Sequence, residues 1–115
     1  MIILDCEIAI VPPSVNHYWV TSGKRRFLSA RAKAFQKVVG QFVKPKMSQE
    51  RLRIEIKAHF GDKRKRDIDN ICKGILDSLV KCGLCLDDEQ FDWLIVKRGE
   101  VIKGGLIKIK VTELI

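Results

Sequence analysis

An apolar stripe between residues 68 and 80 constrains the fold of this chain more than any other feature of its sequence. Apolar side chains recur at spacings of three and four residues: Ile68, Ile71, Cys72, Ile75, Leu76, Leu79 and Val80. This period places them on one side of an α-helix, which must be buried against another element. Gly83 follows, and glycine readily adopts the left-handed conformation that ends a helix. The stripe predicts a helix that packs on a core and ends near Cys82-Gly83.

The other periodic segments predict strands and one more helix. Apolar alternation or short apolar runs predict strands in four segments: 4–10, 53–60, 91–96 and 106–111. A helical spacing of apolar residues begins after Ser29, a suitable N-cap, and ends before Pro45. Pro12-Pro13 ends the first strand, and a loop or short hairpin is expected before Ser29. This order predicts an α+β fold, a mixed or antiparallel sheet that carries two main helices.

Composition limits the classes of protein to which the chain can belong. Its 115 residues, 46% of them hydrophobic, suit a single domain over residues 1–115 and exclude a disordered chain. The 22 Lys and Arg residues against 14 Asp and Glu residues give a net charge of +8. Such a surplus is typical of a surface that binds polyphosphate, although a coat of solvated lysines is an equally open alternative.

The cysteines and the apolar runs indicate a cytoplasmic protein that acts in solution. No apolar run approaches the roughly 18 residues of a membrane span, and no leader-like segment precedes the first strand. We therefore expect no membrane partner and free thiols on the four cysteines. Cys82 and Cys85 have the spacing of half a zinc site, but no second pair accompanies them, so structural zinc is not expected.

The densest chemistry lies between residues 63 and 88, where acidic residues follow directly on basic ones. The cations Lys63, Arg64, Lys65 and Arg66 run into Asp67 and Asp69, and Asp87 and Asp88 follow one helix later. Carboxylates repel a phosphate ligand unless a divalent cation intervenes, and Mg²⁺ or Mn²⁺ prefers such oxygen ligands. A bound metal polarises a phosphodiester oxygen and activates water. Lys73, one turn after Asp69, is placed to stabilise the developing charge.

Each of these acidic residues also has an ordinary structural interpretation. Asp69, Lys73, Asp77 and Lys81 form a ladder of alternating charge, which is typical of a solvated helix face. We prefer that interpretation for Asp77 and Lys81. Asp67 is a fair helix N-cap, and Asp87 and Asp88 are suitable turn residues.

Chain geometry leaves the assembly of the acidic residues open. A helix of about 14 residues separates Asp69 from Asp88 by roughly 20 Å. Residues 82–88, extended at about 3.3 Å each, cover that distance within one subunit. Alternatively, a second subunit supplies the last carboxylate. Asp87 and Asp88 point in opposite directions in an extended segment, so only one of them is expected at the metal.

The ordered set of motifs resembles the RusA family of Holliday junction resolvases, found in bacteria and their phages. The resemblance covers nearly the whole chain. It comprises Pro12-Pro13-Ser14-Val15-Asn16, Arg66-Asp67-Ile68-Asp69-Asn70, Lys73, Leu86-Asp87-Asp88 with Gln90, and Lys103-Gly104-Gly105. Two residues depart from the family pattern. Trp19 stands where a tyrosine is usual, and Cys85 stands where an aromatic residue occurs in another family member. These departures bear on junction distortion and sequence preference.

The resemblance implies a Mg²⁺-dependent endonuclease that cuts four-way branched DNA by paired, symmetric incisions as a homodimer, with no small-molecule cofactor. The family's catalytic acids map onto Asp67, Asp69 and Asp88, and its essential lysine maps onto Lys73. By the same mapping Asp87 is a neighbour of the site. Two equivalent cuts require two sites related by a two-fold axis, which agrees with a dimer.

Further residues are candidates for DNA contact. Lys63, Arg64, Lys65 and Arg66 are expected to hold phosphates beside the metal. Lys24, Arg25 and Arg26 form either a second phosphate contact or a plain hairpin surface. Tyr18 and Trp19 either stack on unpaired bases at the branch point or pack in the core, and core packing is the commoner role of such residues.

Two rival functions remain open. The first is a catalytically inactive dimer that binds junctions and shapes them, in which the aspartates are caps and ion-pair partners. The second is a small basic regulator that prefers linear duplex and needs no metal. A Mg²⁺ titration with four-way and linear DNA separates all three.

Overall fold

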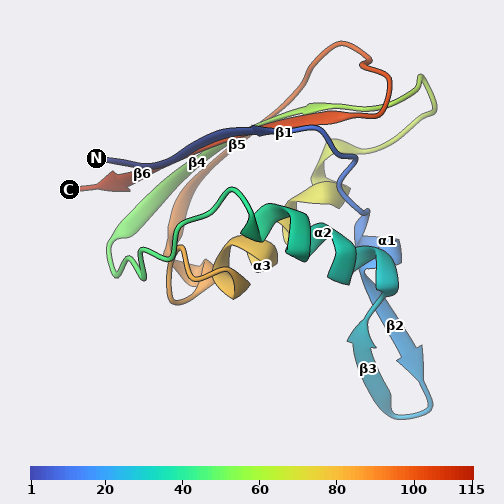
Figure 1. The fold of residues 1–115 in the computed structure, drawn as a ribbon, viewed down its shortest axis with the longest axis horizontal. Coiled ribbons are helices and arrows are strands. Elements are labelled where there is room, and N and C mark those ends of the chain that lie inside the picture. The colour runs from blue at the N-terminus through green and yellow to red at the C-terminus, as the bar shows by residue number, and fades with distance from the viewer.

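A computed structural model describes all 115 residues. Its centre is a four-stranded sheet in the order β1-β6-β4-β5, drawn in Figure 1. β1 pairs with β6 and β6 with β4 in antiparallel fashion, whereas β4 and β5 are parallel. The strands span Ile2–Ile8 (β1), Arg51–His59 (β4), Phe91–Arg98 (β5) and Leu106–Leu114 (β6). The α+β class is confirmed, and of the two predicted sheet types the mixed one is correct.

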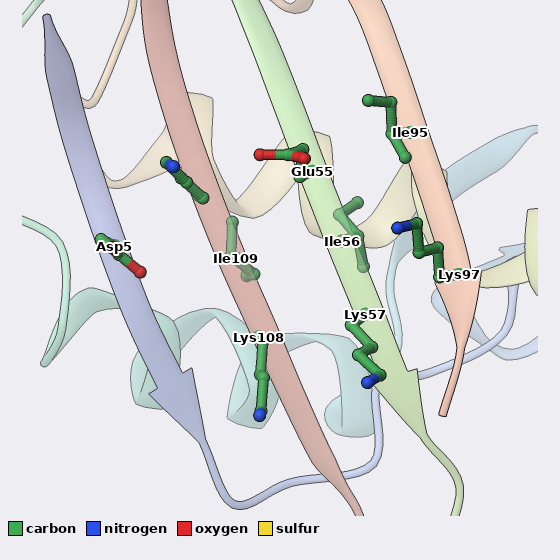
Figure 2. Close-up of a pocket in the computed structure, with 9 residues that line it drawn as sticks. Asp5, Glu55, Ile56, Lys57, Ile95, Lys97, Lys108 and Ile109 are labelled. Atoms are coloured by element: carbon green, nitrogen blue, oxygen red, sulfur yellow. The ribbon is translucent and has the colours of Figure 1, made fainter. Parts of the chain in front are cut away.

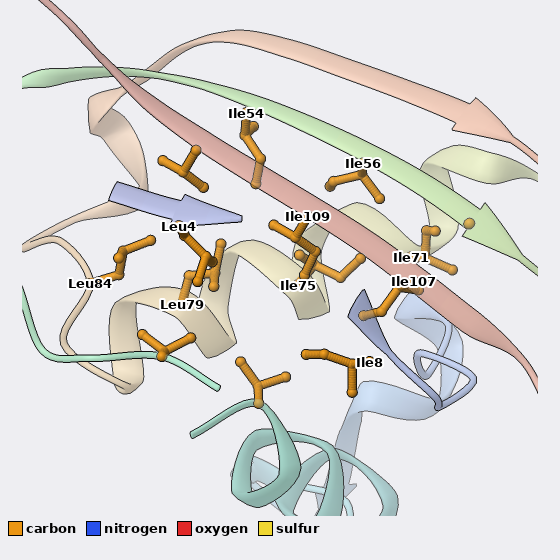
Figure 3. Packing of buried hydrophobic residues seen from close by; sticks show 14 of the residues in the cluster. Leu4, Ile8, Ile54, Ile56, Ile71, Ile75, Leu79, Leu84, Ile107 and Ile109 are labelled. Atoms are coloured by element: carbon orange, nitrogen blue, oxygen red, sulfur yellow. The ribbon is translucent and has the colours of Figure 1, made fainter. Parts of the chain in front are cut away.

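Two helices, α2 (Ala30–Gly40) and α3 (Cys72–Lys81), cover one face of the sheet. Alternate residues of β4 and β6 point toward them and, with Ile75 and Leu79 of α3, form the core shown in Figure 3. The hydroxyl of Ser29 caps α2 by accepting a hydrogen bond from the Ala32 amide at 3.0 Å, as predicted. Burial of these apolar faces is the main stabilising contribution to the fold.

The opposite face of the sheet is not covered by any helix and carries mainly charged side chains. Figure 2 shows a shallow hollow of about 210 Å³ on this face. The charged side chains that line it are Asp5, Glu55, Lys57, Lys97, Lys108 and Lys110. The period of two along β4 and β6 therefore separates an apolar face from a charged one.

The structure differs from the sequence prediction in two segments. The predicted helix starts with a 3-10 turn, η1 (Ile68–Ile71), before α3. Asp69 and Asn70, which lie in this turn, have low helix propensity. The predicted loop or hairpin after Pro13 contains a short helix, α1 (Val15–Tyr18), and then a hairpin of β2 (Trp19–Ser22) and β3 (Arg25–Leu28).

Tyr18 fixes the base of this hairpin to the rest of the molecule. Its side chain is fully buried, and its hydroxyl accepts a hydrogen bond of 2.7 Å from Gln36 Nε2 of α2. A Cβ on Gly74 of α3 would lie 3.1 Å from the Tyr18 ring, so the helix approaches the ring closely. For Tyr18 the core interpretation is correct. None of the helices has the length and hydropathy of a membrane span, and all four cysteines are unpaired.

Candidate active site

Asp67 and Asp69 lie at the entrance to α3 on exposed backbone. Asp67 has an extended conformation (φ −85°, ψ 132°), and its carboxylate makes no capping hydrogen bond to η1. Asp67 therefore occupies the N-cap position, as predicted, but its carboxylate does not act as a cap. Both side chains are exposed, and neither takes part in an ion pair within the chain. Their oxygens are open to a ligand from solution.

The segment after α3 brings Asp88 back along the helix. Gly83 turns the chain with a φ of +85°, which an L side chain rarely adopts. The Met47 amide then donates to the Gly83 carbonyl at 2.8 Å, and the Ser48 amide to the Leu84 carbonyl at 3.0 Å. These bonds tie the returning segment to the chain that precedes β4. Asp88 thus reaches Lys73, near the start of α3, within a single chain.

Lys73 is held between two carboxylates. Its Nζ lies 3.0 Å from Asp88 Oδ2 and 3.2 Å from Asp77 Oδ1. The hydrogen bond to Asp88 is the main cause of a raised pKa at Lys73, and the same bond lowers the pKa of Asp88. The ammonium and the Asp88 carboxylate are therefore both kept charged at neutral pH. Of the predicted ladder along the helix face, only the Lys73–Asp77 ion pair forms. The second partner of Lys73 is Asp88, which lies on the segment after the helix.

Asp87 and Asp88 have different surroundings. Asp87 is the N-cap of η2 (Asp88–Gln90), and its carboxylate accepts a hydrogen bond from the Glu89 amide at 3.0 Å. The turn interpretation is correct for Asp87, whereas the Asp88 side chain faces Lys73. Only one of the two neighbouring aspartates thus reaches the lysine of α3.

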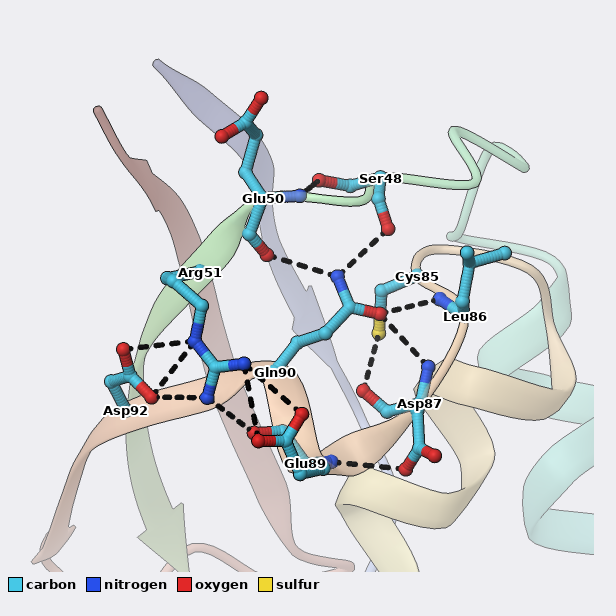
Figure 4. Close-up of polar contacts among 9 residues, drawn as sticks. All are labelled: Ser48, Glu50, Arg51, Cys85, Leu86, Asp87, Glu89, Gln90 and Asp92. Carbon is cyan, nitrogen blue, oxygen red and sulfur yellow. Dashed lines mark hydrogen bonds and ion pairs between the residues drawn. The ribbon is translucent and has the colours of Figure 1, made fainter.

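Gln90 fixes the backbone on the N-terminal side of Asp88 through the contacts drawn in Figure 4. Its amide is buried, with 7% of the residue exposed. Oε1 accepts from the amides of Leu86 and Asp87 at 2.8 and 2.9 Å. Nε2 donates to the carbonyls of Ser48 and Glu50 at 2.8 and 2.9 Å. A single side chain therefore joins the returning segment to the start of β4 through four hydrogen bonds.

Arg51 holds the other side of η2, also in Figure 4. Its guanidinium binds the carboxylates of Asp92 and Glu89 and donates to the Glu89 carbonyl at 2.7 Å. These bonds lower the pKa of Asp92. Sequence reasoning named Gln90 only as part of a motif and missed Arg51. The available signal was Asp87-x-x-Gln90, which has the spacing of a capping box.

The basic run is tied down at one end. Asp62 pairs with Arg66 at 2.7 Å and with Arg64 at 3.0 Å, which lowers the pKa of the Asp62 carboxyl well below its usual range. The guanidinium groups of Arg66 and Arg98 each lie 5.2 Å from the centre of the Phe60 ring. Arg98 also donates to the Arg66 carbonyl, directly before Asp67.

The candidate DNA contacts therefore fall into two groups. Lys63, Arg64 and Lys65 are exposed, whereas Arg66 is partly buried and acts within the fold. Lys24, Arg25 and Arg26 lie at and beyond the turn of the β2–β3 hairpin, all exposed. The roles of Asp62, Phe60 and Arg98 were missed, since a single charge or ring in sequence carries no sign of such packing.

Two hollows receive the charged residues of the site. Asp67 lines one of about 660 Å³, together with Arg64, Lys65 and Arg66. Lys73 and Asp88 line another of about 900 Å³, which extends to the β2–β3 hairpin. No group of three or more Asp, Glu, His or Cys side chains is close enough to hold a metal ion. Carboxylate oxygens suit Mg²⁺, but the single chain does not gather the three predicted ligands.

These features define a class of protein: a small basic α+β domain whose acidic residues and a paired lysine lie within a phosphate-attracting surface. This arrangement is the one expected of an enzyme that acts on nucleic acid.

Comparisons with known proteins agree with that class. The family model described as Endodeoxyribonuclease RusA matches residues 9–112. A protein of Enterobacteria phage HK97 named crossover junction endodeoxyribonuclease rusA is 43% identical over 107 residues, which cover 90% of this chain and 89% of that protein. The protein of the same name from Escherichia coli K12 is 37% identical over 108 residues, with the same coverage of both chains. The chain belongs to the RusA family of endodeoxyribonucleases, as the motifs predicted.

Proposed function

We propose that this protein is a Holliday junction resolvase, an endodeoxyribonuclease that cuts four-way branched DNA with Mg²⁺ as its metal. Family membership supports this reaction, and one structural observation supports the roles of individual residues in it. Lys73 is charged and held 3.0 Å from Asp88, while Asp67 and Asp69 are exposed at the start of the same helical segment. The required acids and the lysine therefore lie at one end of α3, beside the basic run.

The chain supplies defined groups to this reaction. Asp67, Asp69 and Asp88 would hold Mg²⁺, with Mn²⁺ as a substitute, and a bound metal supplies an activated water and a polarised phosphate oxygen. Lys73 neutralises charge that develops on the phosphate or on the leaving oxygen. Lys63, Arg64 and Lys65 attract the DNA backbone, and Lys24, Arg25 and Arg26 contact it at a second place. No small-molecule cofactor is needed.

We further propose that the active form is a homodimer that acts on DNA in the cytoplasm of a bacterial or phage-infected cell. Paired, symmetric cuts need two equivalent sites. Since one chain does not gather three metal ligands, the ligand set is completed by DNA or metal binding, or by a carboxylate of a second copy.

Mixing two inactive variants distinguishes these possibilities. If each site uses acids of one chain only, a mixture of Asp67→Asn and Asp88→Asn stays inactive, because every site carries one defect. If the second copy supplies Asp88, the mixed dimer contains one intact site and nicks one strand. Sedimentation of each variant and of the mixture checks that dimers form. A purely monomeric protein at concentrations that give full activity would contradict the homodimer.

A metal titration tests the activity itself. Labelled four-way and linear DNA are incubated in parallel with 0 to excess Mg²⁺, and nicks are separated on denaturing gels. We expect paired nicks in the four-way DNA that depend on Mg²⁺ and few in linear DNA. Binding to the four-way DNA without any nicks would instead identify the inactive junction-binding dimer. Preference for linear duplex without any metal dependence would identify the basic regulator.

A further inference from the structure

One wall of the hollow beside Lys73 and Asp88 contains an aromatic side chain that the proposed cleavage of the DNA backbone does not use. Trp19, Arg26 and Leu28 of the β2–β3 hairpin line it on one side, and Lys73, Asp77 and Asp88 line it on the other. Figure 1 shows the hairpin extending away from the sheet and the two main helices. The hairpin and α3 together therefore enclose a space that is aromatic on one side and charged on the other.

The aromatic wall has the chemistry that binds a flat, unpaired ring. The guanidinium of Arg26 lies 4.4 Å from the centre of the Trp19 ring. The strand register places these two side chains on one face of the hairpin and Phe27 on the other. Aromatic rings and arginine planes are the surfaces on which unstacked bases settle in nucleic-acid complexes.

Packing within the fold does not account for this wall. Tyr18 alone provides the buried ring that fixes the hairpin base, and it meets Trp19 edge to face with centroids 5.5 Å apart. Trp19 is not part of the buried core cluster. A large aromatic side chain left beside an arginine at a concave surface is typical of a binding site.

We propose that this hollow accepts an unpaired nucleobase from the branch point of the junction, stacked on the surface formed by Trp19 and Arg26. The proposal rests on the placement of cleavage at Lys73 and Asp88. At a branch point a base pair lacks a continuous stack on one side, so its bases cost less to unpair than those within an arm. A base held here places its own backbone next to Lys73. The hollow thus links recognition of the branch to the position of the cut.

The chain contains its own matched control. Trp93 on β5 is 52% exposed and also has an arginine over its ring, with the Arg53 guanidinium 4.5 Å from the centroid. It does not line the hollow shared by Lys73 and Asp88. Both tryptophans therefore have a guanidinium over the ring, but only Trp19 lines the hollow that is proposed to hold the base.

Photo-crosslinking tests the proposal without requiring cleavage. 5-Iodouracil is placed either at the branch point or in the middle of one arm, and the full-length protein is bound in EDTA and irradiated. Mass spectrometry then maps the linked peptide. We expect the branch-point probe, and not the arm probe, to link to residues 19–28. A link from the branch-point probe to the Trp93 peptide, or to no hairpin residue, would overturn the proposal.

Substitutions give an independent measurement. Trp19→Ala is expected to weaken junction binding or to slow single-turnover cleavage by about tenfold, the effect of losing one base stack. Trp93→Ala is expected to leave both within about twofold. Trp19→Phe keeps a flat ring and should recover most of the loss, which separates base stacking from damage to the hairpin. Equal defects in Trp19→Ala and Trp19→Phe, or none in either, would contradict the proposal.

These results are distinguishable from a failure of the proposed chemistry. If Lys73 and Asp88 are not at the cleavage site, their variants cleave normally, whereas the crosslink in EDTA is unaffected. If only the base site is wrong, the metal-dependent nicks remain and the hairpin crosslink is missing.

Discussion

The two groups of acidic residues differ in how firmly the fold holds them. Asp67 directly before the 3-10 turn and Asp69 on it are exposed and have no ion-pair partner. Asp88 instead faces Lys73 on a segment fixed by Gln90 and Arg51. Held groups lose less conformational freedom when a ligand binds. In the proposed site, Asp88 and Lys73 are therefore held in place by the fold, whereas no partner within the chain fixes the side chains of Asp67 and Asp69.

Removing any one carboxylate should have the largest effect on this arrangement. Asp67→Asn, Asp69→Asn and Asp88→Asn are each expected to lower the cleavage rate by about 10³-fold or more, since a metal supplies several kcal/mol of transition-state stabilisation. Junction binding should be retained or improved because anionic repulsion falls. Gel-shift and single-turnover assays measure the two quantities. Full cleavage by one variant would remove that aspartate from the metal site.

Lys73→Ala should break the held part of the site while leaving the exposed part intact. We expect the single-turnover rate to fall by about 10²-fold, comparable to the loss of one charge-stabilising donor. Junction affinity should change much less, because many other cations contact the backbone. Lys37→Ala, at an exposed position of α2 that does not line the hollow beside Lys73, is the control and should cleave normally. An unchanged rate in Lys73→Ala would refute its catalytic role.

Gln90→Met should loosen the segment that carries Asp88 without removing any charge. Its loss leaves buried backbone groups without partners, so we expect about 3 kcal/mol of lost stability. More Mg²⁺ should be needed for half-maximal cleavage, while junction binding stays near normal in the folded fraction. Gln49→Met, at an exposed position just before β4, is the matched control. Equal metal requirements in the two variants would show that Gln90 does not position Asp88.

Arg51→Ala should give the smallest effect, because its ion pairs lie at the surface. In the wild type, Arg51 lowers the pKa of Asp92, so this pair stabilises the fold at neutral pH. That contribution is lost as the pH falls through the lowered pKa. The variant should therefore show a higher Asp92 pKa by NMR and a weaker loss of stability in acid. An unchanged Asp92 pKa would contradict the pairing.

Much of the fold was predictable because it depends on periodic burial. The stripe of Ile75 and Leu79 predicted α3, and the alternation around Ile54 and Ile56 predicted β4. The 3-10 turn at Ile68–Ile71 was missed because it does not alter the apolar period of the sequence. The parallel pairing of β4 with β5 was also not predicted, since strand order depends on contacts between segments far apart in the sequence.

The sequence by itself determined the family and the candidate residues of the site: the aspartates, Lys73 and the basic run stand in an order that identified the family. Only the tertiary structure decided their partners. It joined Lys73 to Asp88 across the turn at Gly83, buried Tyr18 while leaving Trp19 at the hollow, and made Gln90 a support of the site. The physical reason is that composition and motif order are local, whereas ion pairs and burial arise between segments that meet only when the chain has folded.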